Sequence, residues 1–460
     1  MTGAPLIAFY GDDFTGSTDA LECLALSGLK SVLFVDAPSP RLLDEFPDLE
    51  AIGIAGASRS LTPEEMEHAI PPALDALKRT GASILHYKVC STFDSSPTIG
   101  SFGRVMDIAQ RELGAGTIPI VVGAPKLGRY SMFGTLFARH NIDGTVHRID
   151  RHPTMSAHPT TPMTEADMRR HIGAQTRQSI ALFPAPLIGR PADETAAALD
   201  AALTANPDSL LIDIADENAE LRVGALLERM ARRKPPLFVL GSSGVEYALV
   251  AAWRSEGRLA AEPPRMTAGP VDQILVMSGS CSPATGAQIA AAIAAGFRDL
   301  ALDPLKLIEE GSEGPYARDA IARIAGWLSE GHSVVAHSST GPADPREAMV
   351  AAHFARRGHS AEAGRIRGGR ALASASAALL AGVLARVPIE RFVVAGGDTS
   401  SAAVQGLGID ALEVVAPLFP GAPLCRALAQ GRPLHGTELV LKGGQMGGPD
   451  FFLQARAGRR

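Results

Sequence analysis

The chain has 460 residues, of which 46% are hydrophobic and 20% charged. This composition is close to the average of globular proteins and excludes a largely disordered chain. A formal net charge of −6 gives no electrostatic basis for a nucleic-acid partner. The length predicts two or three domains. Only seven lysines stand against 36 arginines, so a lysine in a candidate site is a compositional exception.

Cysteine usage and hydropathy predict a soluble protein of the cytoplasm. The four cysteines are far apart and form no CxxC pair, which argues against a disulfide framework. The N-terminus lacks the basic region of a secretory signal, and no run of about 18 apolar residues predicts a membrane span. We therefore expect no membrane partner. No apolar stripe defines an oligomeric state, and a homo-oligomer is left open.

Short apolar runs alternate with helical stretches in the first half, as in a mostly parallel sheet covered by helices. The expected strands are residues 6–10, 31–35, 51–55, 83–87, 118–122, 210–214 and 237–240. The expected helices are residues 17–26, 63–78, 98–113 and 217–232, with another from Val245.

A proline-containing stretch of low periodicity, residues 257–272, predicts a linker. It would separate an N-terminal domain of residues 1–256 from a C-terminal domain of residues 273–460. In the second domain we expect strands at 273–277, 333–337 and 392–395 and helices at 283–295, 317–328 and 372–384. The predicted fold class is two α/β domains with mostly parallel sheets flanked by helices. The active site is expected in the cleft between them.

The first candidate site follows the first strand. Asp12 and Asp13 stand at its carboxyl end, where open parallel sheets bind ligands. Two adjacent carboxylates can hold a hydroxylated substrate and accept a proton. In the alternative interpretation, Asp12 and Asp13 are only turn and helix-capping residues. We expect Thr15 or Ser17 to cap the following helix.

Cations follow other strands of the first domain. Lys88 ends the fourth strand and precedes a loop rich in hydroxyl groups that includes Ser91. Arg59 and Arg129 lie in loops after the third and fifth strands, and arginine matches a carboxylate bidentately. These side chains suit an anionic or polyhydroxylated ligand.

Four histidines, His147, His152, His158 and His171, lie in one proline-containing stretch. They show no HExxH or similar helical ligand spacing, so we expect an ordered irregular loop and no metal site.

Three small-residue loops follow strands of the second domain. They contain Ser278–Ser282, the residues 396–400, and Lys442 with Gly443 and Gly444. Glycine lets backbone amides approach phosphate oxygens, and a helix N-terminus adds positive potential. None of the loops matches GxxxxGK[ST] or a GxGxxG fingerprint. Three such loops in one domain predict a nucleotide phosphate site of another kind.

Six segments in order, YGDDFTGSTDA, KVCSTFDSS, HPTTPM, SGSCSPAT, AGGDTS and KGGQMGGPDFF, resemble the four-carbon acid sugar kinase family. The resemblance spans nearly the whole chain. It implies an ATP-dependent kinase that phosphorylates the terminal hydroxyl of sugar acids such as 3-oxo-tetronate, threonate and erythronate. It also implies that the first domain binds the sugar acid and the second the nucleotide. The last segment departs from the family, which commonly has KSG where this chain has KGG.

The resemblance also implies roles for individual residues. The sugar-acid pocket would consist of Asp12, Asp13, Arg59, Lys88, Ser91 and Arg129. The nucleotide contacts would come from Ser280, Ser282, Gly396, Gly397, Asp398, Thr399 and Gly444. The expected partners are a sugar acid and ATP, and Mg²⁺ is expected because it shields nucleotide phosphates with few protein ligands of its own.

The expected mechanism is in-line phosphoryl transfer in which an aspartate takes the acceptor proton. Asp13 and Asp398 are the candidate bases, with a slight preference for Asp398. The sequence does not select the sugar acid, and a branched acid such as 3-oxo-isoapionate is an alternative substrate. A dinucleotide-dependent dehydrogenase and a non-catalytic sugar-acid sensor are the alternative functions.

Overall fold

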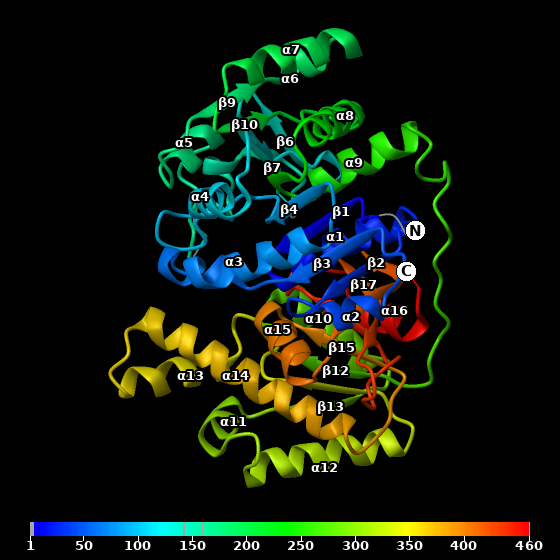
Figure 1. Cartoon of the computed structure of the whole chain (residues 1–460). Coiled ribbons are helices and arrows are strands. Elements are labelled where there is room, and N and C mark those ends of the chain that lie inside the picture. Colours follow the sequence, from blue (N-terminus) through cyan, green and yellow to red (C-terminus); the bar gives the residue numbers. More distant parts are fainter. Residues whose placement is uncertain (1–3, 141–142, 159, 460) are drawn as a thin grey trace. The chain divides into compact units, whose positions relative to one another are not determined.

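The computed structural model describes residues 4–140, 143–158 and 160–459 (Figure 1). Pro159 of the HPTTPM segment lies outside these residues. The chain divides into two compact units, Met1–Pro264 and Arg265–Arg460. In the described part of the chain, no helix combines the length and apolar character needed to cross a membrane.

A parallel sheet forms the centre of the N-terminal unit. Its strands lie in the order β2–β3–β1–β4–β11–β5–β10–β9. They are β1 (Ile7–Gly11), β2 (Ser31–Phe34), β3 (Ala51–Ala55), β4 (Ile84–Lys88), β5 (Ile118–Val121), β9 (Ile180–Phe183), β10 (Ser209–Ile212) and β11 (Leu237–Gly241). Every residue of β1 is buried, as expected for a strand covered by helices on both faces.

Helices of the same unit cover this sheet. They are α1 (Phe14–Leu26), α2 (Pro40–Asp44), α3 (Pro63–Arg79), α4 (Phe102–Leu113), α5 (Met168–Gly173), α6 (Ala185–Ile188), α7 (Ala192–Thr204), α8 (Glu217–Arg233) and α9 (Gly244–Ser255), with 3₁₀ turns at Ser58–Ser60, Pro125–Leu127 and Ile149–Arg151. Helix α3 packs against α4, and α9 packs against both α8 and α1. A Thr62 capping box starts α3.

A second, antiparallel sheet in the same unit consists of β6 (Arg129–Met132), β7 (Thr135–Arg139) and β8 (Val146–Arg148). This sheet was not predicted, because its strands are short and only partly buried. It carries Arg129 and one of the histidines, His147.

The sheet of the C-terminal unit is mixed. The order β13–β14–β12–β15–β18 is parallel, and β18–β17–β16 continues it with antiparallel pairs. The strands are β12 (Leu275–Ser278), β13 (Arg298–Ala301), β14 (Val334–His337), β15 (Arg391–Ala395), β16 (Ala411–Phe419), β17 (Ala422–Leu428) and β18 (Glu438–Lys442).

Long helix α14 (Ala361–Leu384) organises one helical layer of this unit. It packs against α11 (Pro304–Glu310), α12 (Pro315–Ser329), α13 (Pro345–Arg356) and α15 (Gly397–Gly406), whereas α10 (Pro283–Ala294) packs against α16 (Phe451–Ala457). Phe297, Phe451 and Phe452 belong to the apolar core that α10 and α16 share with the sheet.

The fold class is confirmed, and three local predictions were wrong. Helix α14 begins at residue 361 rather than at residue 372, because Ser360 caps it. Helix α1 begins at Phe14, and its cap is Asp13 rather than Thr15 or Ser17, because the Asp13 carboxylate accepts from the Gly16 amide at 2.6 Å. Helix α4 begins at Phe102 rather than at residue 98, since the Ser101 hydroxyl caps it.

Candidate functional site

The carboxyl end of β1 presents two aspartates with different surroundings. Asp13 caps α1 and is about a quarter exposed, whereas Asp12 is buried. The backbone fixes both, because the Asp12 amide donates to the Lys88 carbonyl and its own carbonyl accepts from the Arg59 amide. Three neighbouring strand-end segments are thus joined at this point.

Arg59 binds both carboxylates. Its Nη1 lies 2.6 Å from Asp13 Oδ2, and its Nε lies 3.3 Å from Asp12 Oδ2. A charged hydrogen bond of this kind is stronger than a neutral one, and the planar guanidinium fixes the direction of each contact. The predicted cation and the two predicted carboxylates therefore form one cluster.

The pKa values of two carboxyl groups near Arg59, Asp12 and Asp94, are shifted in opposite directions. Burial, the largest effect, raises the pKa of Asp12 to about 7, although Arg59 and Lys88 oppose it. Burial also raises the pKa of Asp94, but there Arg59 and the hydroxyls of Thr92 and Thr161 prevail and lower it below the ordinary value. Asp94 therefore stays ionised at a pH where Asp12 is close to its midpoint.

Lys88 is buried at the end of β4, and its charge is compensated. Its Nζ lies 3.5 Å from Asp19 Oδ2, and the same carboxylate accepts a short hydrogen bond from the Ser243 hydroxyl. Burial lowers the pKa of Lys88, whereas the carboxylates of Asp19, Glu246 and Asp13 raise it. The effect of the carboxylates is larger in sum, so the pKa lies above its ordinary value. The ammonium is held in place and stays charged.

Asp19, the counter-ion of Lys88, and Ser243, which donates to Asp19, escaped sequence reasoning. Asp19 lies inside α1, six residues after the cap, where it resembles an ordinary helix residue. Ser243 follows β11, which is the neighbour of β4 in the sheet. The segment Gly241-Ser242-Ser243-Gly244 at a strand–helix junction is the signal that could have identified it.

The loop after Lys88 is tied to the HPTTPM segment. Asp94 accepts from Thr92 Oγ1 at 2.6 Å and from Thr161 Oγ1 at 3.0 Å. Phe93 has φ of 54°, a strained conformation for an aromatic residue, and its ring packs edge-on against Phe102. The loop is therefore held in one shape by contacts from both sides.

Ser91 and Arg129 are less closely tied to the carboxylate cluster. Ser91 is half-buried in the turn before Phe93. The Arg129 guanidinium donates to the backbone carbonyls of Leu127, Gly128 and Arg139, while its Nε is buried without a partner in the described structure. Burial is the main cause that lowers the pKa of Arg129, and Cys90 opposes this shift.

The three small-residue loops of the C-terminal unit do meet. Backbone bonds run from Gly279 to the Ala395 carbonyl and from Gly396 to the Lys442 carbonyl. Ser282 caps α10, and its hydroxyl also bonds the Gly444 carbonyl. A Cβ at Gly279 would lie 2.2 Å from Thr399 Oγ1, so this contact requires glycine. Ser280, Ser282, Gly396, Thr399 and Gly444 thus lie together, as predicted for one binding region.

Gly397 and Asp398 occupy the first turn of α15. Gly396 precedes them with φ of 121°, which only glycine adopts readily, and it leaves the helix N-terminus without a side-chain cap. Asp398 is exposed there, and a Cβ on Gly369 of α14 would lie 4.0 Å from its Oδ2. An exposed carboxylate beside free helix amides is accessible to a ligand.

Lys442, expected in one of the three small-residue loops, is the last residue of β18 and is fully buried. Its Nζ donates to Thr285 Oγ1 at 3.0 Å, and Thr285 in turn donates to the Gly444 carbonyl. In the described residues no carboxylate pairs with it, and burial lowers its pKa to about 8. A buried ammonium without a counter-ion beside glycine loops is suited to an anionic ligand.

A fourth loop at this edge was missed. Strand β14 neighbours β12 and leads into Ser338, Ser339, Thr340 and Gly341. The Ser338 amide donates to the Ser278 carbonyl, yet the buried hydroxyls of both serines lack partners among the described residues. A strand followed by SSTG was the available signal. The region therefore offers polar groups that the protein itself leaves unsatisfied.

Comparisons with known proteins find one family model for each of the two units of the chain. A family model described as a sugar-binding N-terminal domain matches residues 7–249, and one described as a nucleotide-binding C-terminal domain matches residues 275–452. The chain belongs to the four-carbon acid sugar kinase family, as the six segments indicated. It is therefore a phosphotransferase with an alcohol group as acceptor.

The curated relatives cover nearly the whole chain. A 3-oxo-isoapionate kinase of Paraburkholderia graminis is 43% identical over 99% of this chain and 94% of its own length. A 3-oxo-tetronate kinase of Methylobacterium radiotolerans is 32% identical over 96% of this chain and 97% of its own length. One from Cupriavidus necator is also 32% identical, over 98% and 96%.

Solved structures share the fold. A Salmonella typhimurium LT2 protein has a TM-score of 0.78 and 26% identity and covers 98% of both chains. Haemophilus influenzae protein HI1011 has a TM-score of 0.72 and 25% identity, with 98% of this chain and 99% of its own covered.

The Lys442 environment predicts a pH-dependent stability. Below pH 8 the folded protein holds a buried ammonium, and between pH 8 and 10.5 it releases a proton that the unfolded chain keeps. The free energy of unfolding should therefore rise with pH in that interval. Lys442→Met should stabilise the nucleotide-free C-terminal unit at pH 7 by about 3 kcal/mol, and less at pH 10.

Urea denaturation at both pH values measures this difference. Lys306→Met, which replaces an exposed lysine of the same unit, should show no such pH-dependent gain. A gain for Lys442→Met that is equal at pH 7 and pH 10 would contradict the assignment of a buried charge.

Proposed function

We propose that the protein is an ATP-dependent kinase that phosphorylates a terminal hydroxyl of a short 3-oxo sugar acid. The favoured acceptor is 3-oxo-isoapionate, and 3-oxo-tetronate is the second candidate. The carrying observation is the cluster of Arg59, Lys88 and two aspartates in a unit that matches a sugar-binding domain. The higher identity to a 3-oxo-isoapionate kinase, 43% against 32%, supports the order of the two acceptors.

The N-terminal unit would bind the acceptor. Lys88 and Arg59 supply positive charge for its carboxylate, and both are already oriented by aspartates. Arg129 and Ser91 would contribute from the edge of the same loop region. A preformed arrangement loses little entropy when it binds its ligand, which favours accurate positioning of the reacting hydroxyl.

The C-terminal unit would bind ATP. Amides of the loops at Gly396 and Gly444, with the hydroxyls of Ser280, Ser282 and Thr399, suit phosphate oxygens, and Lys442 would offset their charge. Mg²⁺ fits a site whose exposed carboxylate is Asp398, because the ion binds mainly to nucleotide oxygens and water. When bound, it would neutralise charge on the transferred group.

In the proposed reaction the acceptor hydroxyl oxygen forms a bond to the γ-phosphorus, and the bond from that phosphorus to the β–γ bridging oxygen breaks. ADP leaves, and an aspartate takes the hydroxyl proton. Asp12 is enclosed and bound to Arg59, so its role would be to hold that arginine. Asp13 and Asp398, which are both accessible, are the proposed bases.

Separate Asp13→Asn and Asp398→Asn variants test the base. The variant that removes the base should lower kcat by about 100-fold or more, because general-base catalysis contributes that much, while ligand dissociation constants change little. Steady-state kinetics and calorimetric binding provide the measurements. If both variants keep near-native kcat with intact binding, neither aspartate is the base.

A coupled ADP-release assay over a panel of sugar acids tests the function. The panel contains 3-oxo-isoapionate, 3-oxo-tetronate, D-threonate and D-erythronate, and we expect the highest kcat/KM with the first. A single lost or misplaced hydrogen bond in a polar site can change this ratio by orders of magnitude. Binding of NAD(P)H without ADP release would instead support a dehydrogenase, and sugar-acid binding without turnover would support a sensor.

A further inference from the structure

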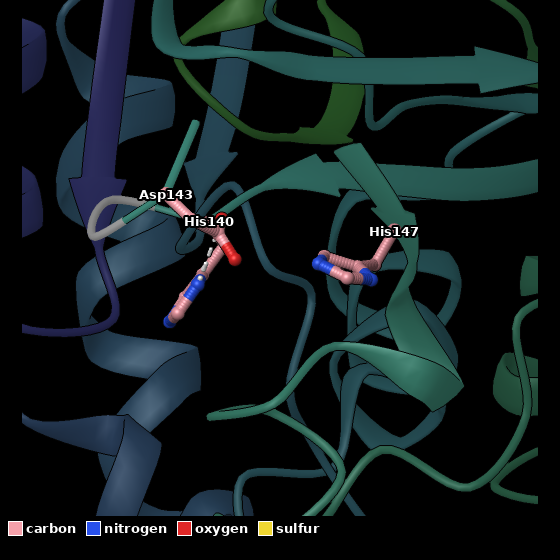
Figure 2. A group of neighbouring side chains, drawn as sticks. All are labelled: His140, Asp143 and His147. Atoms are coloured by element: carbon pink, nitrogen blue, oxygen red, sulfur yellow. Dashed lines mark hydrogen bonds and ion pairs between the residues drawn. The ribbon is translucent and has the colours of Figure 1, made fainter. Parts of the chain in front are cut away.

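The hairpin of β7 and β8 brings together three side chains that carry metal-binding atoms (Figure 2). In the ladder, Ala138 lies opposite His147, and His140 stands two residues beyond Ala138 on the same face. His140 and His147 are therefore diagonal neighbours across the two strands. Asp143 comes from the turn that joins them, and its Oδ1 also accepts from the Thr145 amide.

The distances between these groups suit one ion. One donor atom from each of His140, Asp143 and His147 lies within 4.8 Å of the others, and His140 Nδ1 is 3.1 Å from Asp143 Oδ1. Ligands bound tetrahedrally at about 2.1 Å are roughly 3.4 Å apart. Donor atoms that are farther apart than this, up to the 4.8 Å limit, must move closer together when an ion binds.

Two buried nitrogen atoms in this place lack partners. His147 Nε2 and His152 Nε2 make no hydrogen bond within the described residues, although His152 is only 5% exposed. The His152 ring centroid lies 5.3 Å from that of His140 and 5.9 Å from that of His147. A buried polar atom without a partner destabilises the fold unless another group satisfies it. The cluster is therefore incomplete without a further group.

The His152 ring is oriented by its own backbone. Its Nδ1 accepts from the amides of Thr154 and Met155 at 3.2 and 3.3 Å. In the neutral ring the proton is then on Nε2, which becomes a donor toward the cluster rather than a ligand. Such a donor suits a water molecule or carboxylate that is itself bound to a metal.

We propose that His140, Asp143 and His147 bind one transition-metal ion of the Zn²⁺ type, with His152 as an outer hydrogen-bond donor. Two imidazoles and one carboxylate favour such an ion over Mg²⁺, which prefers oxygen ligands. The absence of helical ligand spacing does not argue against this site, because its ligands come from strand β8 and from the segment that joins β7 to it. Three protein ligands leave one position for water.

The bound ion braces the β7–β8 pair, which adjoins β6, the strand that carries Arg129. Arg129 lies opposite Ala138 in the neighbouring ladder, and its Nη1 donates to the Arg139 carbonyl at 3.3 Å. His140 is the next residue after this carbonyl. One peptide unit therefore connects the metal site to Arg129, a predicted sugar-acid residue. The proposal of a metal site does not depend on the proposed kinase reaction.

Zinc titration of the untagged, chelator-treated full chain against a chromophoric chelator tests the site. We expect one Zn²⁺ per chain, and affinity should fall at least about tenfold in His147→Gln and in Asp143→Asn. His68→Gln, which changes an exposed histidine of α3, should bind zinc as the wild type does. The visible spectrum of the Co²⁺ form should indicate a four-coordinate ion and should be lost in both ligand variants.

Circular dichroism separates loss of binding from loss of fold, and Asp143→Asn changes only an exposed turn. Failure of the wild-type chain to bind Zn²⁺ would overturn the proposal. Equal affinity in the wild type and both ligand variants would also overturn it, because the ion would then bind elsewhere, for example at cysteine thiols.

Discussion

The pairing of two aspartates with Arg59 at the carboxyl end of β1 is the interaction that organises the N-terminal site. An aspartate as buried as Asp12 is costly unless a cation neutralises it. Arg59 provides that charge and also binds Asp13, which caps α1. One guanidinium therefore links a strand end and a helix start, and the Asp12 amide extends the link to Lys88.

The two buried lysines, in a chain that favours arginine five to one, show how the units differ. Lys88 has Asp19 as a built-in counter-ion and keeps its charge with or without a ligand. Among the described residues Lys442 bonds a hydroxyl and lies over the Phe451 ring but has no carboxylate partner, and its pKa is lowered to about 8. A compensated cation suits recognition of a substrate with several polar groups, whereas an uncompensated one favours a ligand that brings strong negative charge, as a nucleotide does.

Much of this arrangement could be predicted, because strand-end loops in a parallel sheet gather at one edge. That rule places Asp12 with Lys88, and Gly279 with Gly396, from their positions after strands. It says nothing of contacts made by helix interiors, so Asp19 was missed. The β7–β8 hairpin was not predicted because its strands are short. Its histidines were not recognised as possible ligands because their spacing is not that of ligands on one helix. Lys442 was underestimated because burial, which shifts its pKa, is not visible in the sequence.

The central claim is that the acceptor binds the N-terminal unit and the nucleotide the C-terminal unit. Amide hydrogen exchange of the full chain, measured by mass spectrometry with each ligand alone, tests it most directly. A non-hydrolysable ATP analogue should slow exchange in residues 278–282, 396–399 and 442–444, and the sugar acid in residues 11–13, 57–59 and 88–94. Protection of the β1 and β4 loops by the ATP analogue alone, with none in the C-terminal loops, would contradict the account.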